Sequence, residues 1–198
     1  MEQPNQLTPL LTALAGLYAA ENRAGGDQAA RELLRAASVK RKLPNAQSPA
    51  LAEALHETLA GNPHPLSPLI RSTNPWIAWG GCDLGHRIKS EIAQEMMLVE
   101  LVGPDGMFSS DTVRVGLWLQ NSGVDYSLRN HSAEETFVIL GGSAIWQTSE
   151  TDPITKGCGA MIHHPSNILH ADRTTNTPLL AAWRWSGELS FELYALKG

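Results

Sequence analysis

Two histidines and one glutamate form the group of residues most able to do chemistry in this sequence. His131 and Glu135 lie four positions apart, and His170 follows further along the chain. Two imidazoles and one carboxylate suit Fe(II), Mn(II), Ni(II) or Zn(II). The segments around them have strand character, and residues four apart on a strand share a face. With His170 arriving from another strand, the three predict a metal site inside a small β-barrel. The alternative for His131 and Glu135 is an incidental surface pair.

The spacing around these residues resembles the two motifs of the cupins. The matching stretches are Gly123-x5-Arg129-x-His131-x3-Glu135-x6-Gly142 and Gly159-x5-Pro165-x-Asn167-x2-His170-x3-Thr174. Arg129 stands where the first motif has a histidine, so three of the four ligands remain. The resemblance implies a mostly β fold, the cupin (double-stranded β-helix or jelly-roll) barrel. It also implies a metal with open coordination positions for a substrate or water.

Further residues narrow the resemblance to the cupin dimethylsulfoniopropionate (DMSP) lyases. They are Glu100 to Pro104, Tyr126, the HSAEE block from His131, the HHPS block from His163, His170-Ala171 and Trp185-Ser186-Gly187. The resemblance is close from about Glu95 onward. It implies that His131, Glu135 and His170 bind the metal. Phe137 stands where the family has a tyrosine, two residues after the ligand glutamate, whereas a second family tyrosine is retained as Tyr126.

This resemblance implies a carbon–sulfur lyase that releases dimethyl sulfide and acrylate from DMSP or a related small carboxylate. A base must remove a proton, and Phe137 lacks the hydroxyl to do so. Tyr126 or a metal-bound hydroxide is therefore the expected base. Arg129 is expected to bind a carboxylate as a two-pronged donor, with a solvated charge on a strand edge as the alternative. Trp185 is expected to contact the sulfonium by a cation–π interaction, and Phe137 to line the same pocket.

Two other functions remain open on the sequence alone. Two histidines and a carboxylate also suit an Fe(II)-dependent oxygenase. A cupin that binds a ligand without catalysis is the third possibility. Acrylate release without oxygen consumption distinguishes the lyase from the oxygenase, and tight binding without turnover indicates the third.

The periodicity of the chain predicts two parts. Residues 1–72 are expected to form a helical region that packs on the barrel, because Leu10, Leu14 and Leu17 recur at helical spacing. Residues 73–198 are expected to form the cupin barrel with its metal site. Alternation begins near Met96 and is clear from Val113 onward. Gly141-Gly142 predicts a hairpin turn, and residues 189–196 predict a final strand.

Composition excludes several classes of function. The chain has 198 residues, 42% hydrophobic content and a formal net charge of −5, which gives nucleic-acid binding no electrostatic support. It has no apolar run long enough for a membrane span and no signal peptide pattern. We therefore expect a cytoplasmic protein, as a monomer or a homodimer. The adjacent His163 and His164 point to opposite faces of a strand, and both are expected outside the site.

Overall fold

Helices occupy the first part of the chain and strands the rest, in the computed structural model that describes residues 4–61, 64–82, 84 and 86–196. The helices are α1 (Thr8–Ala19), α2 (Ala24–Ser38), α3 (Ala52–Gly61), α4 (Ser67–Thr73), the 3-10 turn η1 (Asn74–Trp76) and the short α5 (Ser90–Ala93). Among the described residues, no helix has the length and apolar character needed to cross a membrane. In α1, the buried residues Leu10, Leu11, Leu14 and Tyr18 fall at helical spacing on the face that packs inward.

The strands form one strongly curved sheet. They are β1 (Gly80–Gly81), β2 (Met96–Gly103), β3 (Phe108–Ser109), β4 (Val113–Gln120), β5 (Asp125–Asn130), β6 (Ala133–Thr148), β7 (Thr151–Gly157), β8 (Met161–His164), β9 (His170–Arg173), β10 (Leu179–Gly187) and β11 (Ala195–Leu196). Their order is β1-β2-β4-β10-β6-β9-β5-β11, with β3 on β2 and with β7 and β8 on β6. The prediction of a mostly β fold with an N-terminal helical region is confirmed.

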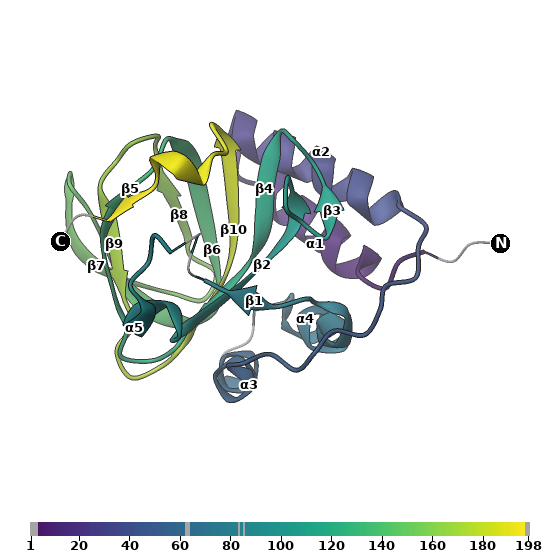
Figure 1. Cartoon of the computed structure of the whole chain (residues 1–198), viewed down its shortest axis with the longest axis horizontal. Helices are drawn as coiled ribbons and strands as arrows, with labels where there is room; N and C mark the ends of the chain where they lie inside the picture. Colours follow the sequence, from purple (N-terminus) through teal and green to yellow (C-terminus); the bar gives the residue numbers. More distant parts are fainter. Residues whose placement is uncertain (1–3, 62–63, 83, 85, 197–198) are drawn as a thin grey trace.

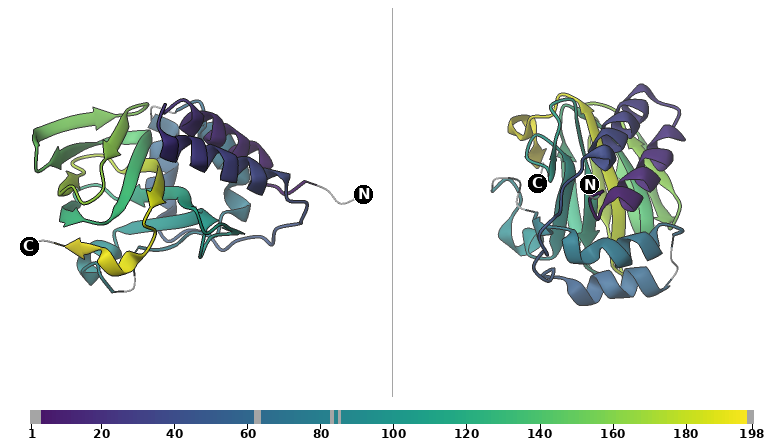
Figure 2. Two further views of the ribbon diagram at one scale, coloured as in Figure 1. Left: turned by 90° about the horizontal axis from the view of Figure 1, so that it is seen from above. Right: turned by 90° about the vertical axis from the view of Figure 1, so that its right-hand side faces the viewer.

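The central strands have two buried faces. One face of β2, β4, β6 and β10 packs under the helices, and Figure 1 shows α1 and α2 lying along it. The opposite face lines the barrel interior, where β5 to β9 curl away from the helices (Figure 2). Strand alternation divides β4 accordingly: Val115 and Leu117 face the helices, whereas Trp118 faces the interior. Because both faces are covered, the strands combine helix packing with an enclosed pocket.

Strand β6 corrects the predicted hairpin turn at Gly141-Gly142. It runs for 16 residues without a turn. Its first part pairs with β10 and β8, and its last part pairs with β7 and β9. The pairing with β10 shifts register beside Gly141, and Gly142 has a φ of +73°. The two glycines therefore form a bulge that lets one strand pass from one side of the barrel to the other.

The last predicted strand is shorter in the structure. The strand predicted over residues 189–196 is instead a 3-10 turn, η2 (Phe191–Leu193), followed by the two-residue β11. The segment leads from β10 to the edge of β5, where only the two residues of β11 join the sheet. Trp76 and Trp79 pack against the helix-facing core. They therefore help to join the helical part to the strands.

Gly116 is the point of closest approach between β4 and β2. A Cβ atom at this position would lie 1.8 Å from the carbonyl oxygen of Val99. We expect Gly116→Ala to lower the free energy of unfolding by about 1–3 kcal/mol, because the strands must separate. Gly16 is the matched control, since nothing lies within 4 Å of its Cβ position.

Urea unfolding measures both variants. Gly16→Ala should raise the free energy of unfolding by about 0.5–1 kcal/mol, since Gly16 lies inside an exposed helical turn. Equal stabilities for the two variants would contradict the packing described for Gly116.

Candidate metal centre

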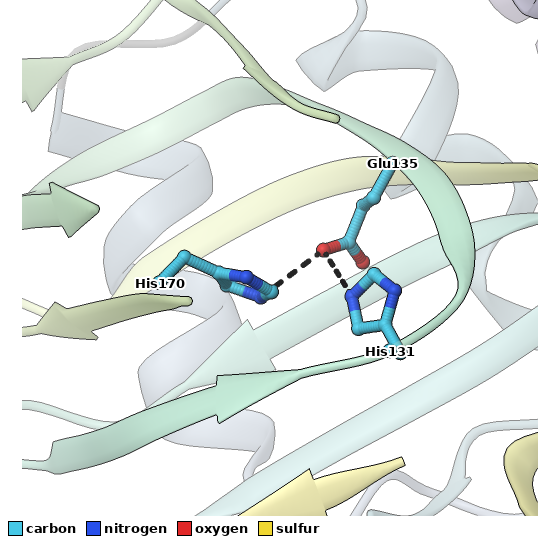
Figure 3. A group of neighbouring side chains, drawn as sticks. All are labelled: His131, Glu135 and His170. Carbon is cyan, nitrogen blue, oxygen red and sulfur yellow. Dashed lines mark hydrogen bonds and ion pairs between the residues drawn. The ribbon is translucent and has the colours of Figure 1, made fainter. Parts of the chain in front are cut away.

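His131, Glu135 and His170 converge inside the barrel. Their candidate ligand atoms all lie within 4.8 Å of one another, and all three residues are buried. Figure 3 shows the Glu135 carboxylate projecting toward both imidazoles. The sequence therefore identified a group that the fold brings together.

The path of the chain at this site differs from the one predicted. His131 lies between β5 and β6 and not on a strand, because β5 ends at Asn130 and β6 begins at Ala133. Glu135 lies on β6, and His170 is the first residue of β9. His131 and Glu135 share a direction because the chain turns between them, and not because they alternate along one strand.

Hydrogen bonds to the backbone orient both imidazoles. His131 Nδ1 lies 3.0 Å from the carbonyl oxygen of Ala133, and His170 Nδ1 lies 3.0 Å from that of Ile168. Because a carbonyl only accepts, each Nδ1 carries a proton, and the neutral ring then presents a lone pair at Nε2. Metal-binding histidines are commonly held in this way.

The two Nε2 atoms face one carboxylate oxygen. Glu135 Oε2 lies 3.2 Å from His131 Nε2 and 3.6 Å from His170 Nε2. His170 Nε2 is buried and has no hydrogen-bond partner. A cation, either a proton on an imidazole or a metal ion, is needed to hold these three atoms so close together. A divalent metal satisfies this requirement, so the residues present fit a metal ion.

The protonation states also suit metal binding. Burial alone would raise the pKa of the Glu135 carboxyl, but the surrounding imidazoles hold it well below its usual range. Burial, with Arg129 and His164 nearby, holds the pKa of His170 well below its usual range. Glu135 is therefore ionised and His170 neutral, which are the forms that bind a metal.

His164 corrects the expectation that both adjacent histidines lie outside the site. It is buried, its ring stacks on His170 at a centroid distance of 4.1 Å, and its Nδ1 lies 3.5 Å from Glu135 Oε2. The pairing of β8 with β6 sets His164 opposite Glu135. His163 points to the other face of the strand, as predicted, toward Thr136. Only the pairing partner, which the sequence does not specify, decides which histidine faces the metal ligands.

Trp185 supports the carboxylate directly. Its indole Nε1 donates to Glu135 Oε1 at 2.6 Å, and its ring stacks on His131 at a centroid distance of 4.3 Å. The pairing of β10 with β6 places Trp185 opposite Glu135. The residue expected to contact substrate therefore also holds the Glu135 carboxylate in place.

Arg129 is buried, so the alternative of a solvated strand-edge charge is wrong. It donates to Asp172 Oδ1 at 2.5 Å and to the carbonyl oxygen of Tyr126 at 3.1 Å. Its guanidinium lies 3.7 Å from the centre of the Tyr126 ring. Asp172 stabilises the charged guanidinium, which raises the pKa of Arg129 despite burial. A cation thus lines the cavity where many cupins place a metal ligand.

Tyr126 forms a buried pair with a residue that the sequence reasoning missed. Its hydroxyl makes a short hydrogen bond with the hydroxyl of Tyr194, and both residues line the cavity beside the metal ligands. Burial raises the pKa of both phenols. Tyr194 lies immediately before β11, in a segment without motif spacing, so only the fold reveals its position.

Aromatic rings form most of the cavity wall. Phe137 lines it, as predicted, and packs against Trp118 at a centroid distance of 5.4 Å. Glu135 is the one carboxylate among the described lining residues. The other aromatic lining residues are Trp118, Tyr126, Trp183, Trp185, Phe191 and Tyr194. The cavity is therefore suited to an organic cation of small size next to a metal.

Comparison with known proteins gives consistent results. A family model described as dimethylsulfoniopropionate lyase matches residues 20–181. The dimethylsulfoniopropionate lyase DddQ of Ruegeria pomeroyi is 31% identical over 105 residues, which are 53% of this chain and 52% of that protein. The matched segment thus spans about half the length of the curated relative.

Solved structures show the same fold over nearly the whole chain. The crystal structure of DMSP lyase DddQ from Ruegeria pomeroyi has a TM-score of 0.70 and 21% identity, and the match covers 96% of this chain and 95% of that one. A chain from the crystal structures of the DMSP lyases RdDddP and RnDddQII has a TM-score of 0.68 and 20% identity, with coverage of 96% and 100%. These likenesses confirm the predicted cupin fold.

Removing one imidazole tests the metal centre. We expect His131→Ala purified with zinc to retain far less metal than the wild type, because only two protein ligands remain. His56→Ala is the matched control, since His56 is an exposed residue of α3. Elemental analysis of the purified proteins measures the ratio of metal to chain. Full occupancy in His131→Ala would refute the assignment.

Proposed function

This chain belongs to the dimethylsulfoniopropionate lyase family, and from that premise we propose that it cleaves DMSP, or a closely related small carboxylate, by β-elimination. A base removes a proton from the carbon next to the carboxylate, and the electron pair of the broken C–H bond forms the new double bond. The bond between the β-carbon and sulfur breaks, and sulfur keeps that electron pair. The products are acrylate, dimethyl sulfide and the proton taken by the base.

We assign the metal to His131, Glu135 and His170, with Fe(II), Mn(II), Ni(II) and Zn(II) as the ions that suit this ligand set. When bound, such an ion supplies a Lewis acid that stabilises negative charge on the substrate carboxylate. Three protein ligands leave coordination positions free. His131 and Glu135 line the aromatic cavity, and this placement is the observation that supports the proposal.

Arg129 is proposed to orient the carboxylate of the substrate. A guanidinium has five N–H donors. Asp172 and the carbonyl of Tyr126 each accept from one of its terminal nitrogens. The donors that remain lie at the cavity, where they can bind a carboxylate while Asp172 keeps the side chain in place.

The aromatic wall is proposed to hold the sulfonium end. A cation over an aromatic ring gains roughly 0.5–2 kcal/mol, with the larger values in dry sites. Trp183 and Trp185 both line the cavity and meet edge to face at 6.4 Å. The same rings make the surroundings of the cavity apolar, which strengthens the attraction between the substrate carboxylate and Arg129.

Tyr126 is proposed as the proton acceptor, because Phe137 has no hydroxyl. Its raised pKa means that the phenol does not ionise on its own at neutral pH. A phenolate becomes accessible when cations lie close by, and Arg129 already lies over the ring. Tyr194 contributes a second hydroxyl that can donate to the Tyr126 oxygen once the latter loses its proton.

Exchanging the two hydroxyl positions tests this assignment. Tyr126→Phe should lower acrylate formation by roughly 10²–10⁴-fold, the usual contribution of a general base. Phe137→Tyr should raise it by at least about tenfold, because the new phenol shares a strand face with Glu135. Gas chromatography of dimethyl sulfide and chromatography of acrylate measure both. Wild-type activity in Tyr126→Phe would exclude Tyr126 as the base.

Trp185 requires two variants because it contacts both Glu135 and the cavity. Trp185→Phe keeps an aromatic ring but removes the indole donor, so we expect KM to change little and metal affinity to fall. Trp185→Ala removes both, so KM should also rise about 2–30-fold, as loss of the cation–π contact implies. Steady-state kinetics with saturating metal separate the two effects. Equal KM values in the two variants would remove the sulfonium contact from the proposal.

An Fe(II) oxygenase is the second candidate, favoured by the two-histidine, one-carboxylate ligand set and by the phenylalanine at position 137. Oxygen uptake by the iron-loaded protein, recorded beside the acrylate assay, separates the two functions. Acrylate release without oxygen uptake supports the lyase. Oxygen uptake without acrylate supports the oxygenase instead.

A further inference from the structure

A buried polar cluster lies on the other side of the strands that carry the metal centre. Arg184 of β10 is fully buried and donates two hydrogen bonds to Glu21. Its Nε donates to Oε2 at 2.8 Å, and its Nη2 donates to Oε1. Thr136 of β6 donates to Glu21 Oε1 at 2.7 Å and lies 3.1 Å from Nδ1 of His163 on β8. One carboxylate from the link between α1 and α2 thereby joins three neighbouring elements of the sheet.

The cluster is in register with the metal centre, one residue away along each strand. Thr136 pairs with Arg184 on one side and with His163 on the other. The adjacent residue on each strand faces the barrel interior. Glu135 of β6 is opposite Trp185 of β10 and also opposite His164 of β8. Each outer residue is therefore the chain neighbour of an inner one, so the backbone position of one sets that of the other.

The composition of this face indicates that the cluster has a specific role. Further along the same strands, away from Glu134 and Ser186, the helix-facing residues are apolar and include Val138, Leu180 and Ala182. A buried ion pair is rarely the most stable choice at such a position, since apolar side chains would avoid the desolvation cost. Buried ionic groups are retained in several proteins because they define one arrangement among alternatives.

Two glycines at the start of α2 leave room for Glu21 and Arg184 to meet. A Cβ atom at Gly25 would lie 2.3 Å from Ser186 Oγ and 2.6 Å from Arg184 Nη1. A Cβ atom at Gly26 would lie 2.7 Å from Glu21 Oε2. Glycine at both positions lets α2 begin directly against the cluster.

A second metal ion is not needed here. Ligand atoms of Glu21, Glu134 and His163 lie within 4.8 Å of one another. Arg184 already donates to both carboxylates, to Glu134 Oε1 at 2.8 Å and to Glu21 as above. Arg184 is the buried cation of this cluster, and the half-exposed Arg23 adds a second guanidinium 3.8 Å from Glu21 Oε1.

We propose that Glu21 and Arg184 are positioning residues for the metal centre, because they fix the mutual register of β6, β8 and β10 at the level of Glu135. This inference rests on the metal centre proposed above but not on the identity of the substrate. It predicts that residues on the outer face of the sheet set the affinity for metal on the inner face.

The test is the zinc affinity of Glu21→Gln, measured by competition with a chromophoric chelator at a temperature well below unfolding. We expect zinc to bind about tenfold more weakly, the lower end of what supporting residues contribute to metal sites. If Glu21→Gln does not fold, Thr136→Val serves instead. It removes only the hydroxyl that bonds Glu21, and we expect a smaller weakening in the same direction.

Asn5→Ala is the matched control for a general loss of stability. Asn5 is buried and donates to the carbonyl oxygens of Ala36 and Val39, so it joins α1 to α2 without touching a strand. This variant should lower the melting temperature and leave zinc affinity unchanged. Wild-type zinc affinity in both Glu21→Gln and Thr136→Val, or equal weakening in Asn5→Ala, would overturn the inference. Failure of the metal centre itself is recognised separately, because His131→Ala would then bind zinc as the wild type does.

Discussion

The structure depends on one buried carboxylate that must be neutralised. Glu135 lies inside an apolar barrel, where an isolated charge would be very costly. Trp185 and His164 approach its oxygens, and two imidazoles held by backbone carbonyls aim their Nε2 atoms at it. These neighbours keep the carboxyl ionised, and a divalent cation bound by the carboxylate and the two Nε2 atoms would complete the arrangement.

The two faces of the central strands have different roles. The helix-facing side supplies most of the apolar core, whereas the interior side supplies the cavity and the ligands. Strand β6 links the two, because it is long enough to pair with β10 and β8 near Glu135 and with β7 and β9 beyond its bulge. Phe137 on the same strand brings no hydroxyl to the cavity, so Arg129 and Tyr126 on β5, with Tyr194, add polar groups to its otherwise aromatic wall.

The sequence predicted the parts of this site that motif spacing determines. His131, Glu135 and His170 follow the cupin spacing, and the fold brings them together. The place of Tyr194 in the site could not be predicted, because it depends on the fold of the short segment between β10 and β11. The prediction that His164 lies outside the site is wrong. Alternation along a strand shows that two adjacent residues face opposite sides, but it does not show which residue faces the site. Glycine is favoured both in hairpin turns and in bulges, so the sequence predicts a turn at Gly141 where the structure has a bulge. Only the strand pairing distinguishes the two.

X-ray absorption at the zinc edge of the zinc-loaded protein tests the central claim most directly, since it reports the ligands of the bound ion. We expect two imidazoles and one carboxylate, with zinc–nitrogen distances of about 2.0–2.1 Å. The spectrum of His170→Ala should contain a single imidazole. A zinc–sulfur distance of about 2.3 Å, which would assign the ion to a cysteine, or a spectrum without imidazole scattering would contradict it.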